Sequence, residues 1–288
     1  MKNKRSKSTI ILVFVFFLGL AILLYPTISN YWNQLNASRA VIDYTEKVEK
    51  LTKEEIETMK EEANAYNKQF VGKFPEFVDG PVEDEHYRSL VNVTGDGMIG
   101  HVTIESLGVS LPFYHGTSDR TLATAGGHLE GSSLPVGGED THAVITSHRG
   151  LPAAKLFTDL DQMEVGDQFY LTVLDEAMYY EVDDIRIILP EEVEHLSIIS
   201  DEEYVTLFTC TPYAVNTHRL LVRGKRVDSP EEGLRINDEA VKIDPIIVAI
   251  FMGIPILMIV FTIILLTPKI KNEQPIQLER SSNHDKES

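Results

Sequence analysis

The chain has 288 residues, of which 44 are acidic and 26 are basic, and its formal net charge at pH 7 is −18. Residues 1–8 carry four cations and residues 268–288 carry four charges of each sign, so residues 9–267 carry −22, which excludes binding to nucleic acid through its phosphates. A single cysteine excludes an internal disulfide and an all-cysteine metal site, so Cys210 is either an inert buried thiol or a nucleophile.

The N-terminus combines a basic segment, residues 1–8, with an uncharged apolar segment, residues 9–26, which includes TIILVFVFFLGLAILLY. That run is longer than a signal-peptide core, and no convincing Ala-x-Ala cleavage pattern follows it. We therefore interpret residues 9–26 as an uncleaved transmembrane helix rather than a cleaved signal.

Residues 27–71 predict a helical stalk, because charged residues are dense and neither Gly nor Pro occurs over 32–70. Thr52 and Glu55 have the spacing of a capping box, in which each side chain satisfies a backbone N–H of the other residue. Residues 72–98 are rich in Gly and Pro and predict a turn-rich connector.

Residues 99–228 change to short β-like runs separated by Gly, Pro and Asp clusters. The runs are HVTIESL, VSLPFYH, HAVITSH, QFYLTVL, MYYEVDDIRIIL, YVTLFTC and RLLVRGKRV. Strands of this length with frequent turn signals indicate an all-β barrel or sandwich. One short helix is expected over Ala153–Leu160, where Ala153, Leu156 and Leu160 share a face.

A linker over 229–245 leads to a second predicted transmembrane helix over 246–267, whose sequence IIVAIFMGIPILMIVFTIILLT carries no charge. Lys269 and Lys271 open the tail, residues 268–288, so basic residues flank the outer end of each span. The positive-inside rule then places both termini in the cytoplasm and residues 27–245 outside. An exported domain without disulfides suits a bacterial cell surface.

Two residues are positioned to activate Cys210, which ends its strand-like run. A thiolate needs a nearby cation or base, and His148 follows the apolar run Ala143–Ser147 before a sharp turn. If the two strand ends meet at one face of a barrel, the thiol and the imidazole come within reach of each other. Arg219 follows a turn-rich loop and would lie beside Cys210 if the two strands are antiparallel neighbours, where a guanidinium stabilises an oxyanion. Spacing alone leaves open a surface arginine and the weaker bases His128 and His218.

The segments TLFTC (206–210), TPYAVNTHRLLVRG (211–224) and HAVITSHRGLPAAKLFTDL (142–160) resemble the sortases, and specifically class C, the pilin-polymerising transpeptidases of Gram-positive bacteria. GHLEGSSLPVGG (127–138) and GHVTIESLGVSLPFYHGTS (100–118) fit the same group, and a second C-terminal apolar segment is common in it. The resemblance implies a mainly β fold, a closed barrel of about eight strands with short helices over residues 99–228, preceded by the stalk and flanked by two transmembrane helices.

The resemblance also implies a role for each candidate residue. Cys210 would attack the threonine carbonyl of an LPXTG-like sorting signal and release glycine, while His148 would protonate the leaving amine and then deprotonate the incoming one. Arg219 would hold the substrate and stabilise the oxyanion. The acceptor would be a lysine amine of a pilin subunit, and neither a metal nor an organic cofactor is needed.

One segment departs from the class C pattern. These enzymes usually carry a lid loop before the barrel with an Asp-Pro-aromatic motif, but FPEFVDGPV (74–82) has Gly80 after Asp79, and Phe77 precedes that aspartate. The sequence therefore predicts either a lid with altered anchors, for which Phe77 and Asp79 are the candidates, or a more open site.

Three alternatives remain open at this stage. A wall-anchoring sortase would lack the second span that favours pilin polymerisation, and a membrane-tethered cysteine peptidase would use the same residues with water as the acceptor. A non-enzymatic surface scaffold would bury an inert Cys210. The sequence names neither the pilin, nor its sorting motif, nor the acceptor lysine.

Overall fold

The computed structural model describes residues 7–78, 80–229, 253 and 257. The chain divides into a unit of residues 1–234 and a unit of residues 235–288, and the helices and strands named below belong to the first. Apart from Ser229, Gly253 and Leu257, the predicted linker, second span and tail lie outside the described residues.

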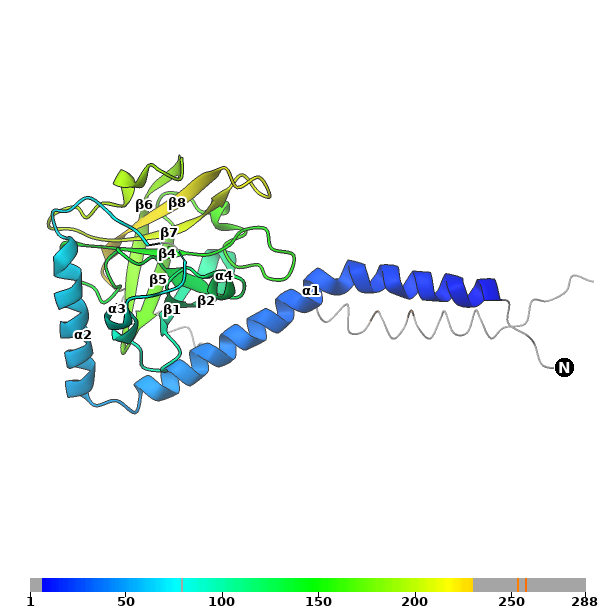
Figure 1. The fold of residues 1–288 in the computed structure, drawn as a ribbon, viewed down its shortest axis with the longest axis horizontal. Helices are drawn as coiled ribbons and strands as arrows, with labels where there is room; N and C mark the ends of the chain where they lie inside the picture. Colours follow the sequence, from blue (N-terminus) through cyan, green and yellow to red (C-terminus); the bar gives the residue numbers. More distant parts are fainter. Residues whose placement is uncertain (1–6, 79, 230–252, 254–256, 258–288) are drawn as a thin grey trace, which may run out of the picture. The chain divides into compact units, whose positions relative to one another are not determined.

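The first helix, α1 (Lys7–Val48), is 42 residues long and continues through Pro26, so the predicted span and the first part of the predicted stalk form one helix (Figure 1). Within the described residues it is the one helix long and apolar enough to cross a membrane, and its most apolar window is unburied. These properties are compatible with membrane anchoring.

The second helix, α2 (Lys53–Asn67), begins after a short turn at the predicted capping box. The Thr52 side chain accepts a hydrogen bond from the backbone N–H of Glu55 at 3.2 Å, and the Glu55 carboxylate accepts one from the backbone N–H of Thr52 at 2.8 Å. The helix is followed by η1 (Lys68–Phe70), the connector and the short helix α3 (Glu85–Ser89). The capping box is therefore confirmed.

One face of α2 packs on the barrel. Its buried side chains join the main core, and the amide of Asn67 donates to the carbonyl of Leu134 and accepts from the backbone N–H of Leu134. The buried apolar residues of α2 are Ile56, Ala63 and Tyr66.

Eight strands within the described residues close into a barrel in the order β1-β2-β3-β4-β7-β8-β6-β5. Strands β2 and β3 pair in parallel, as do β4 and β7, and the other neighbours pair antiparallel. This closed mainly β barrel confirms the predicted fold class. The strands are β1 (Met98–Ile104), β2 (Val109–His115), β3 (Gly126–His128), β4 (Thr141–Thr146), β5 (Gln168–Val173), β6 (Glu176–Ile188), β7 (Glu203–Thr211) and β8 (His218–Val227).

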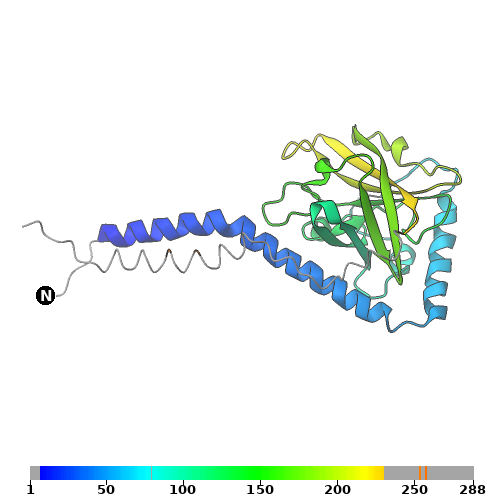
Figure 2. The same cartoon turned by 180° about the vertical axis from the view of Figure 1, so that it is seen from behind.

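Short helices occupy four of the connections between these strands. They are η2 (Glu105–Leu107), α4 (Asp119–Leu122), η3 (Leu160–Gln162) and η4 (Val193–Leu196). The hairpin loop between β7 and β8 and the helix α2 lie on opposite sides of the barrel (Figures 1 and 2).

Alternate residues of the central strands bury two different apolar clusters. Val205 and Leu207 of β7 point into the barrel and join the main core, while Phe208 packs against a second cluster. Because successive side chains of a strand point to opposite faces, the second cluster lies on the outside of the barrel, and we call it the outer apolar cluster. Its buried members are Leu129, Val144, Ile188, Leu196 and Leu221.

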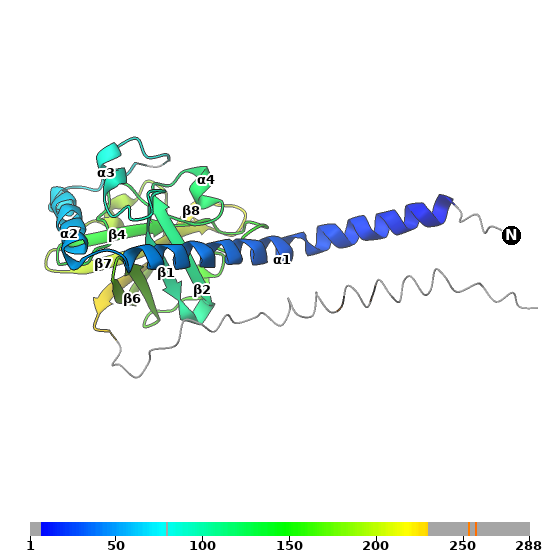
Figure 3. The same ribbon diagram turned by 90° about the horizontal axis from the view of Figure 1, so that it is seen from below.

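The C-terminal part of α1 lies against β1 and β2 (Figure 3). Tyr44 is 1% exposed, and its hydroxyl donates to the carbonyl of Ile99 and accepts from the backbone N–H of Leu174, both at 2.7 Å. The Tyr44 ring packs with Val48 and Met98. One tyrosine therefore joins α1 to strand β1 and to the turn between β5 and β6.

Two local predictions are wrong. The helix expected over Ala153–Leu160 is a series of turns, in which Leu156 has a φ of +45°, so the backbone cannot continue as a right-handed helix. Strand β3 was not anticipated, because the three residues Gly126-Gly127-His128 are too short and too glycine-rich to give a strand pattern.

Candidate active site

Three neighbouring strands bring Cys210, His148 and Arg219 to one level of the barrel. Cys210 and Arg219 are direct partners in the antiparallel β7–β8 ladder. The parallel β4–β7 ladder ends with Thr146 opposite Phe208. His148 and Cys210 each lie two residues beyond this last pair.

The chain after β4 keeps to this register as far as Ser147. Its backbone N–H donates to the carbonyl of Phe208 at 3.2 Å, and its carbonyl accepts from the hydroxyl of Thr209 at 2.8 Å. Hence both backbone groups of Ser147, the residue before His148, are hydrogen-bonded to the strand that carries Cys210.

Cys210 and Arg219 belong to the outer face of the barrel. Cys210 alternates in phase with Phe208, and Arg219 with Leu221, and both of those side chains contact the outer apolar cluster. Arg219 also pairs with Ile188 of β6, a buried member of that cluster. The site therefore combines a half-buried thiol with a polar strand end and an adjacent apolar surface.

The guanidinium of Arg219 is held by its own hairpin. Its Nη1 donates to the carbonyl of Asn216 at 3.1 Å and to that of His218 at 3.2 Å. His218 opens β8 opposite Thr211, and its Nδ1 lies 2.9 Å from the hydroxyl of Thr217. The two Arg219 bonds hold the tip of its side chain against the hairpin loop, while the backbone of Arg219 pairs with that of Cys210 in the ladder.

Arg149, which was not a candidate on sequence grounds, joins the two strand ends. Its side chain is 9% exposed, forms an ion pair with Asp161 and donates from Nη1 to the hydroxyl of Thr211 at 3.3 Å. Arg149 follows His148 directly and Thr211 follows Cys210 directly. A charged residue between a strand end and a sharp turn was the one sequence signal that pointed to this role.

Tyr213 makes a second link between the same two segments. Gly150 has a φ of +80°, and a Cβ added there would lie 2.9 Å from Cε2 of Tyr213. A side chain at position 150 would therefore both strain the backbone and displace the ring. The glycine lets the hairpin after Cys210 close on the loop after His148.

The connector before the barrel reaches the outer apolar cluster. Phe77 packs against it, and the backbone N–H of Val78 donates to the carbonyl of Glu130 at 3.0 Å. Gly131 allows the backbone of Glu76 to approach so closely that a Cβ would lie 2.1 Å from the Glu76 carbonyl oxygen. Asp79, the other lid candidate, lies outside the described residues.

A hollow of about 390 Å³ opens where this connector meets the barrel. Its walls come from the connector, from the loop between β3 and β4, and from the loop between β6 and β7. Lining residues include Phe74, Phe77, Ser132, His142 and Leu196. Because Phe77 and Leu196 also contact the outer apolar cluster, the hollow continues that apolar surface.

Three other histidines are sealed in the interior. Burial lowers the pKa of His128 to about 3, and its ring nitrogens lie 2.6 Å from the Tyr87 hydroxyl and 2.8 Å from the Ser133 carbonyl. Burial likewise lowers the pKa values of His115 and His142 to about 4. A fully buried His128 cannot reach Cys210 on the outer face, which leaves His148 and His218 as the candidate bases.

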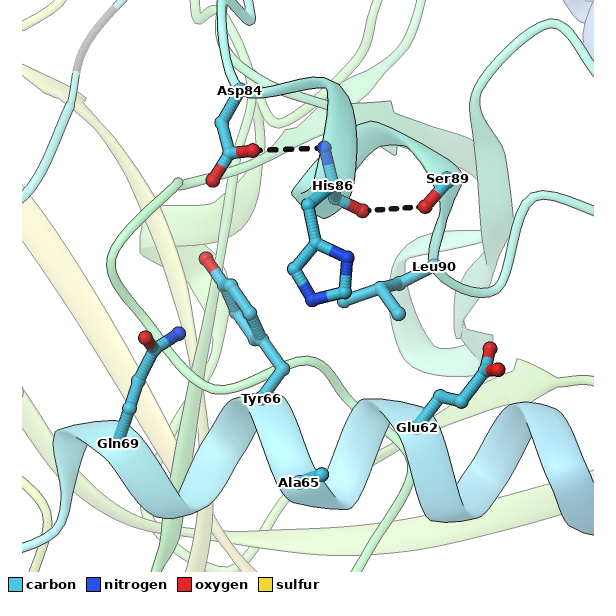
Figure 4. Close-up of a pocket in the computed structure, with 8 residues that line it drawn as sticks. All are labelled: Glu62, Ala65, Tyr66, Gln69, Asp84, His86, Ser89 and Leu90. Carbon is cyan, nitrogen blue, oxygen red and sulfur yellow. Dashed lines mark hydrogen bonds between the residues drawn. The ribbon is translucent and has the colours of Figure 1, made fainter.

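A second hollow, of about 410 Å³, lies between α2 and α3 (Figure 4). Tyr66 and His86 face it together with Glu62 and Asp84, and the Asp84 carboxylate accepts from the backbone N–H of His86 at 2.8 Å. None of the three candidate catalytic residues lines it. Within the described residues, no group of three His, Cys, Asp or Glu side chains could hold a metal ion.

Comparison with known proteins agrees with this geometry. The sortase domain model matches residues 102–227. The crystal structure of sortase C1 from Streptococcus agalactiae is 43% identical, with a TM-score of 0.63, and the match covers 67% of this chain and 100% of that chain. The crystal structure of sortase C from Streptococcus pneumoniae is 42% identical, with a TM-score of 0.62, and the match covers 66% of this chain and 97% of that one.

A more distant relative, sortase A of Streptococcus agalactiae, is 28% identical over 132 residues, so this chain spans about half of that relative, 52%, and the match covers 44% of this chain. The barrel, its strand-end cysteine and these similarities define the class: the chain belongs to the sortase family. Within that family it is a class C sortase, because the S. agalactiae and S. pneumoniae sortases C share its fold at more than 40% identity. The resemblance stated from the sequence is thereby confirmed.

Proposed function

We propose that this chain is a membrane-anchored cysteine transpeptidase that cleaves an LPXTG-like sorting signal between Thr and Gly and joins the released acyl group to a lysine amine of a pilin subunit. The observation that supports the proposal is the pairing of Cys210 with Arg219 in the β7–β8 ladder of a sortase barrel, with His148 two residues beyond the end of β4, the other neighbour of β7. No other described part of the outer face combines a thiol, an imidazole and a guanidinium.

The reaction divides into two acyl transfers. The Cys210 thiolate adds to the threonine carbonyl, and Arg219 donates hydrogen bonds to the oxyanion that forms. The C–N bond breaks as the His148 imidazolium gives its proton to the leaving glycine amine, which leaves a thioester on Cys210. The neutral His148 then takes a proton from the attacking lysine amine, whose nitrogen displaces the Cys210 sulfur and forms an isopeptide bond.

The outer apolar cluster supports a role in holding the sorting signal. It lies on the same face as Cys210 and presents aliphatic side chains from β4, β6 and β8. A leucine and a proline that precede the scissile threonine would bury their side chains there. The packing of Phe77 on this cluster supports a lid with altered anchors, which a substrate would have to displace.

Pilin polymerisation is favoured over wall anchoring by the class C membership and by the predicted second span at 246–267. The crystal structure of the S. pneumoniae sortase C provides insight into the pilin substrate specificity of that protein. In our proposal both termini are cytoplasmic, and the barrel lies outside the membrane on the continuous helix α1. A peptidase would share every proposed catalytic residue and differ only in using water.

The test uses the full chain in detergent micelles with an LPXTG-type peptide, followed by intact-protein mass spectrometry. The proposal expects a mass gain on Cys210 that is absent in Cys210→Ala and is discharged by an added pilin domain with an accessible lysine. If only water discharges the acyl-enzyme, the proposed transpeptidase function is wrong and the chain is a peptidase. A missing adduct, also after deletion of residues 74–82 to remove a lid, would refute both.

A further inference from the structure

The loop over residues 149–160, which leads away from His148, is held from outside the barrel by α1. The side-chain oxygen Oδ1 of Asn30 accepts a hydrogen bond from the backbone N–H of Lys155 at 2.7 Å. The side-chain nitrogen Nδ2 of Asn33 donates to the carbonyl of Ala153, also at 2.7 Å. Two asparagines three residues apart on one helix therefore hydrogen-bond to two backbone groups of one loop.

The same loop is bonded directly to His148. The backbone N–H of Phe157 donates to the carbonyl of His148 at 3.2 Å, and the N–H of Gly150 donates to the hydroxyl of Thr158 at 3.2 Å. Phe157 is 1% exposed and Ala154 is 3% exposed, so both are fixed in the main core. Displacement of residues 153–155 would therefore move the residues that hold the His148 backbone.

Two backbone groups of the loop find their partners outside it. In a helix over 153–160 the carbonyl of Ala153 would accept from the N–H of Phe157, but that N–H donates to the carbonyl of His148. The N–H of Lys155 would lie in the first turn, where a helix supplies no partner of its own. Asparagine is unfavourable in a helix interior, because its side chain competes for backbone hydrogen bonds. Its use at positions 30 and 33, both half-buried, is explained by the two bonds to this loop.

We propose that Asn30 and Asn33 make α1 part of the active-site scaffold, as positioning residues that hold the loop behind His148 in register with Cys210. The inference rests on the proposed function of His148. Its consequence is that the helix carrying the apolar span also sets the geometry of the reaction, so removal of residues before position 34 would lower activity without any loss of a catalytic group.

The two amides differ in their hydrogen-bonding roles, and this difference gives a sharp test. Asn30→Asp keeps an acceptor for the N–H of Lys155. Asn33→Asp loses the donor and sets a carboxylate against the carbonyl of Ala153. Both changes are isosteric and add one negative charge, and Asn36→Asp adds the same charge at an exposed position of the same helix.

The experiment compares these three variants and the wild type as full chains in detergent micelles. One readout is the rate of acyl-enzyme formation on Cys210 with an LPXTG-type peptide, and the other is the amide hydrogen exchange of residues 149–160. Asn33→Asp is expected to lower the saturating acylation rate about tenfold with KM unchanged, because the outer apolar cluster is built from other elements. It should also speed exchange in the loop, while Asn30→Asp and Asn36→Asp stay within about twofold of the wild type in both readouts.

Equal behaviour of Asn33→Asp and Asn36→Asp in both readouts would overturn the inference. Equal slowing by Asn30→Asp and Asn33→Asp would also overturn it, because charge rather than hydrogen bonding would then be responsible. Failure of the wild type to form the acyl-enzyme would instead refute the proposed function, and the exchange measurement would still report whether α1 holds the loop.

Discussion

Tyr44→Phe is expected to destabilise the helix–barrel unit by about 2–6 kcal/mol. The substitution keeps the buried ring and its contacts with Val48 and Met98, so the change is confined to the hydroxyl. That hydroxyl makes two hydrogen bonds of 2.7 Å, and its loss leaves the carbonyl of Ile99 and the backbone N–H of Leu174 buried without this partner. An unpaired buried polar group costs about 1–3 kcal/mol, and the two together give the estimate.

The assay is thermal unfolding of the full chain in detergent micelles, followed by near-ultraviolet circular dichroism. For a unit of this size each kcal/mol shifts Tm by roughly 2–4 °C, so a fall of at least about 4 °C, and at most about 24 °C, is expected. Tyr179→Phe removes the same atom from a half-buried ring of β6 and should change Tm by less than about 2 °C. If the two variants melt together, α1 is not fixed to the barrel through Tyr44 and the reasoning fails.

The remaining predictions concern the reaction and its pH range. Arg219→Lys keeps the charge but loses the planar fork, so steady-state transfer should fall at least tenfold, and wild-type turnover would remove the oxyanion role. Arg149→Met breaks the links to Asp161 and Thr211, so the acylation rate should fall about tenfold with KM unchanged; a rise in KM alone would contradict a positioning role. In urea unfolding, the free energy of unfolding should fall by about 2 kcal/mol per buried histidine as the pH is lowered from 7 to 5. The reason is that these histidines have a pKa near 6.5 in the unfolded chain and bind protons there, whereas in the folded interior they stay neutral. A flat profile would show that these histidines are not held neutral. They are His115, His128 and His142.

Most helices and strands of this protein can be predicted from local sequence patterns. The apolar run of the first span, the capping box at Thr52 and the alternating strand runs each depend on residues a few positions apart, so their physical causes are visible without the fold. The candidate residues could also be predicted from the sequence, because Cys210 and His148 each end a strand-like run. A short hairpin returns Arg219 to Cys210.

Contacts between segments far apart in the sequence could not be predicted from local patterns. Strand β3 has only three residues and exists because β2 and β4 flank it, and the helix expected over 153–160 gave way to turns whose backbone groups bond elsewhere. The role of Arg149 depends on Asp161 and Thr211, which lie 12 and 62 residues further along the chain.

The elements and the chemical groups available for catalysis follow from the sequence, since propensity, capping and hydrophobic period act over one or two turns of chain. Only the folded chain shows that β4 and β7 pair in parallel, and that α1 bonds to a loop more than a hundred residues away. Both features are hydrogen bonds to backbone N–H and C=O groups, and every residue carries such groups whatever its side chain. The local sequence therefore does not mark which groups will pair, and the packing of the whole chain selects them.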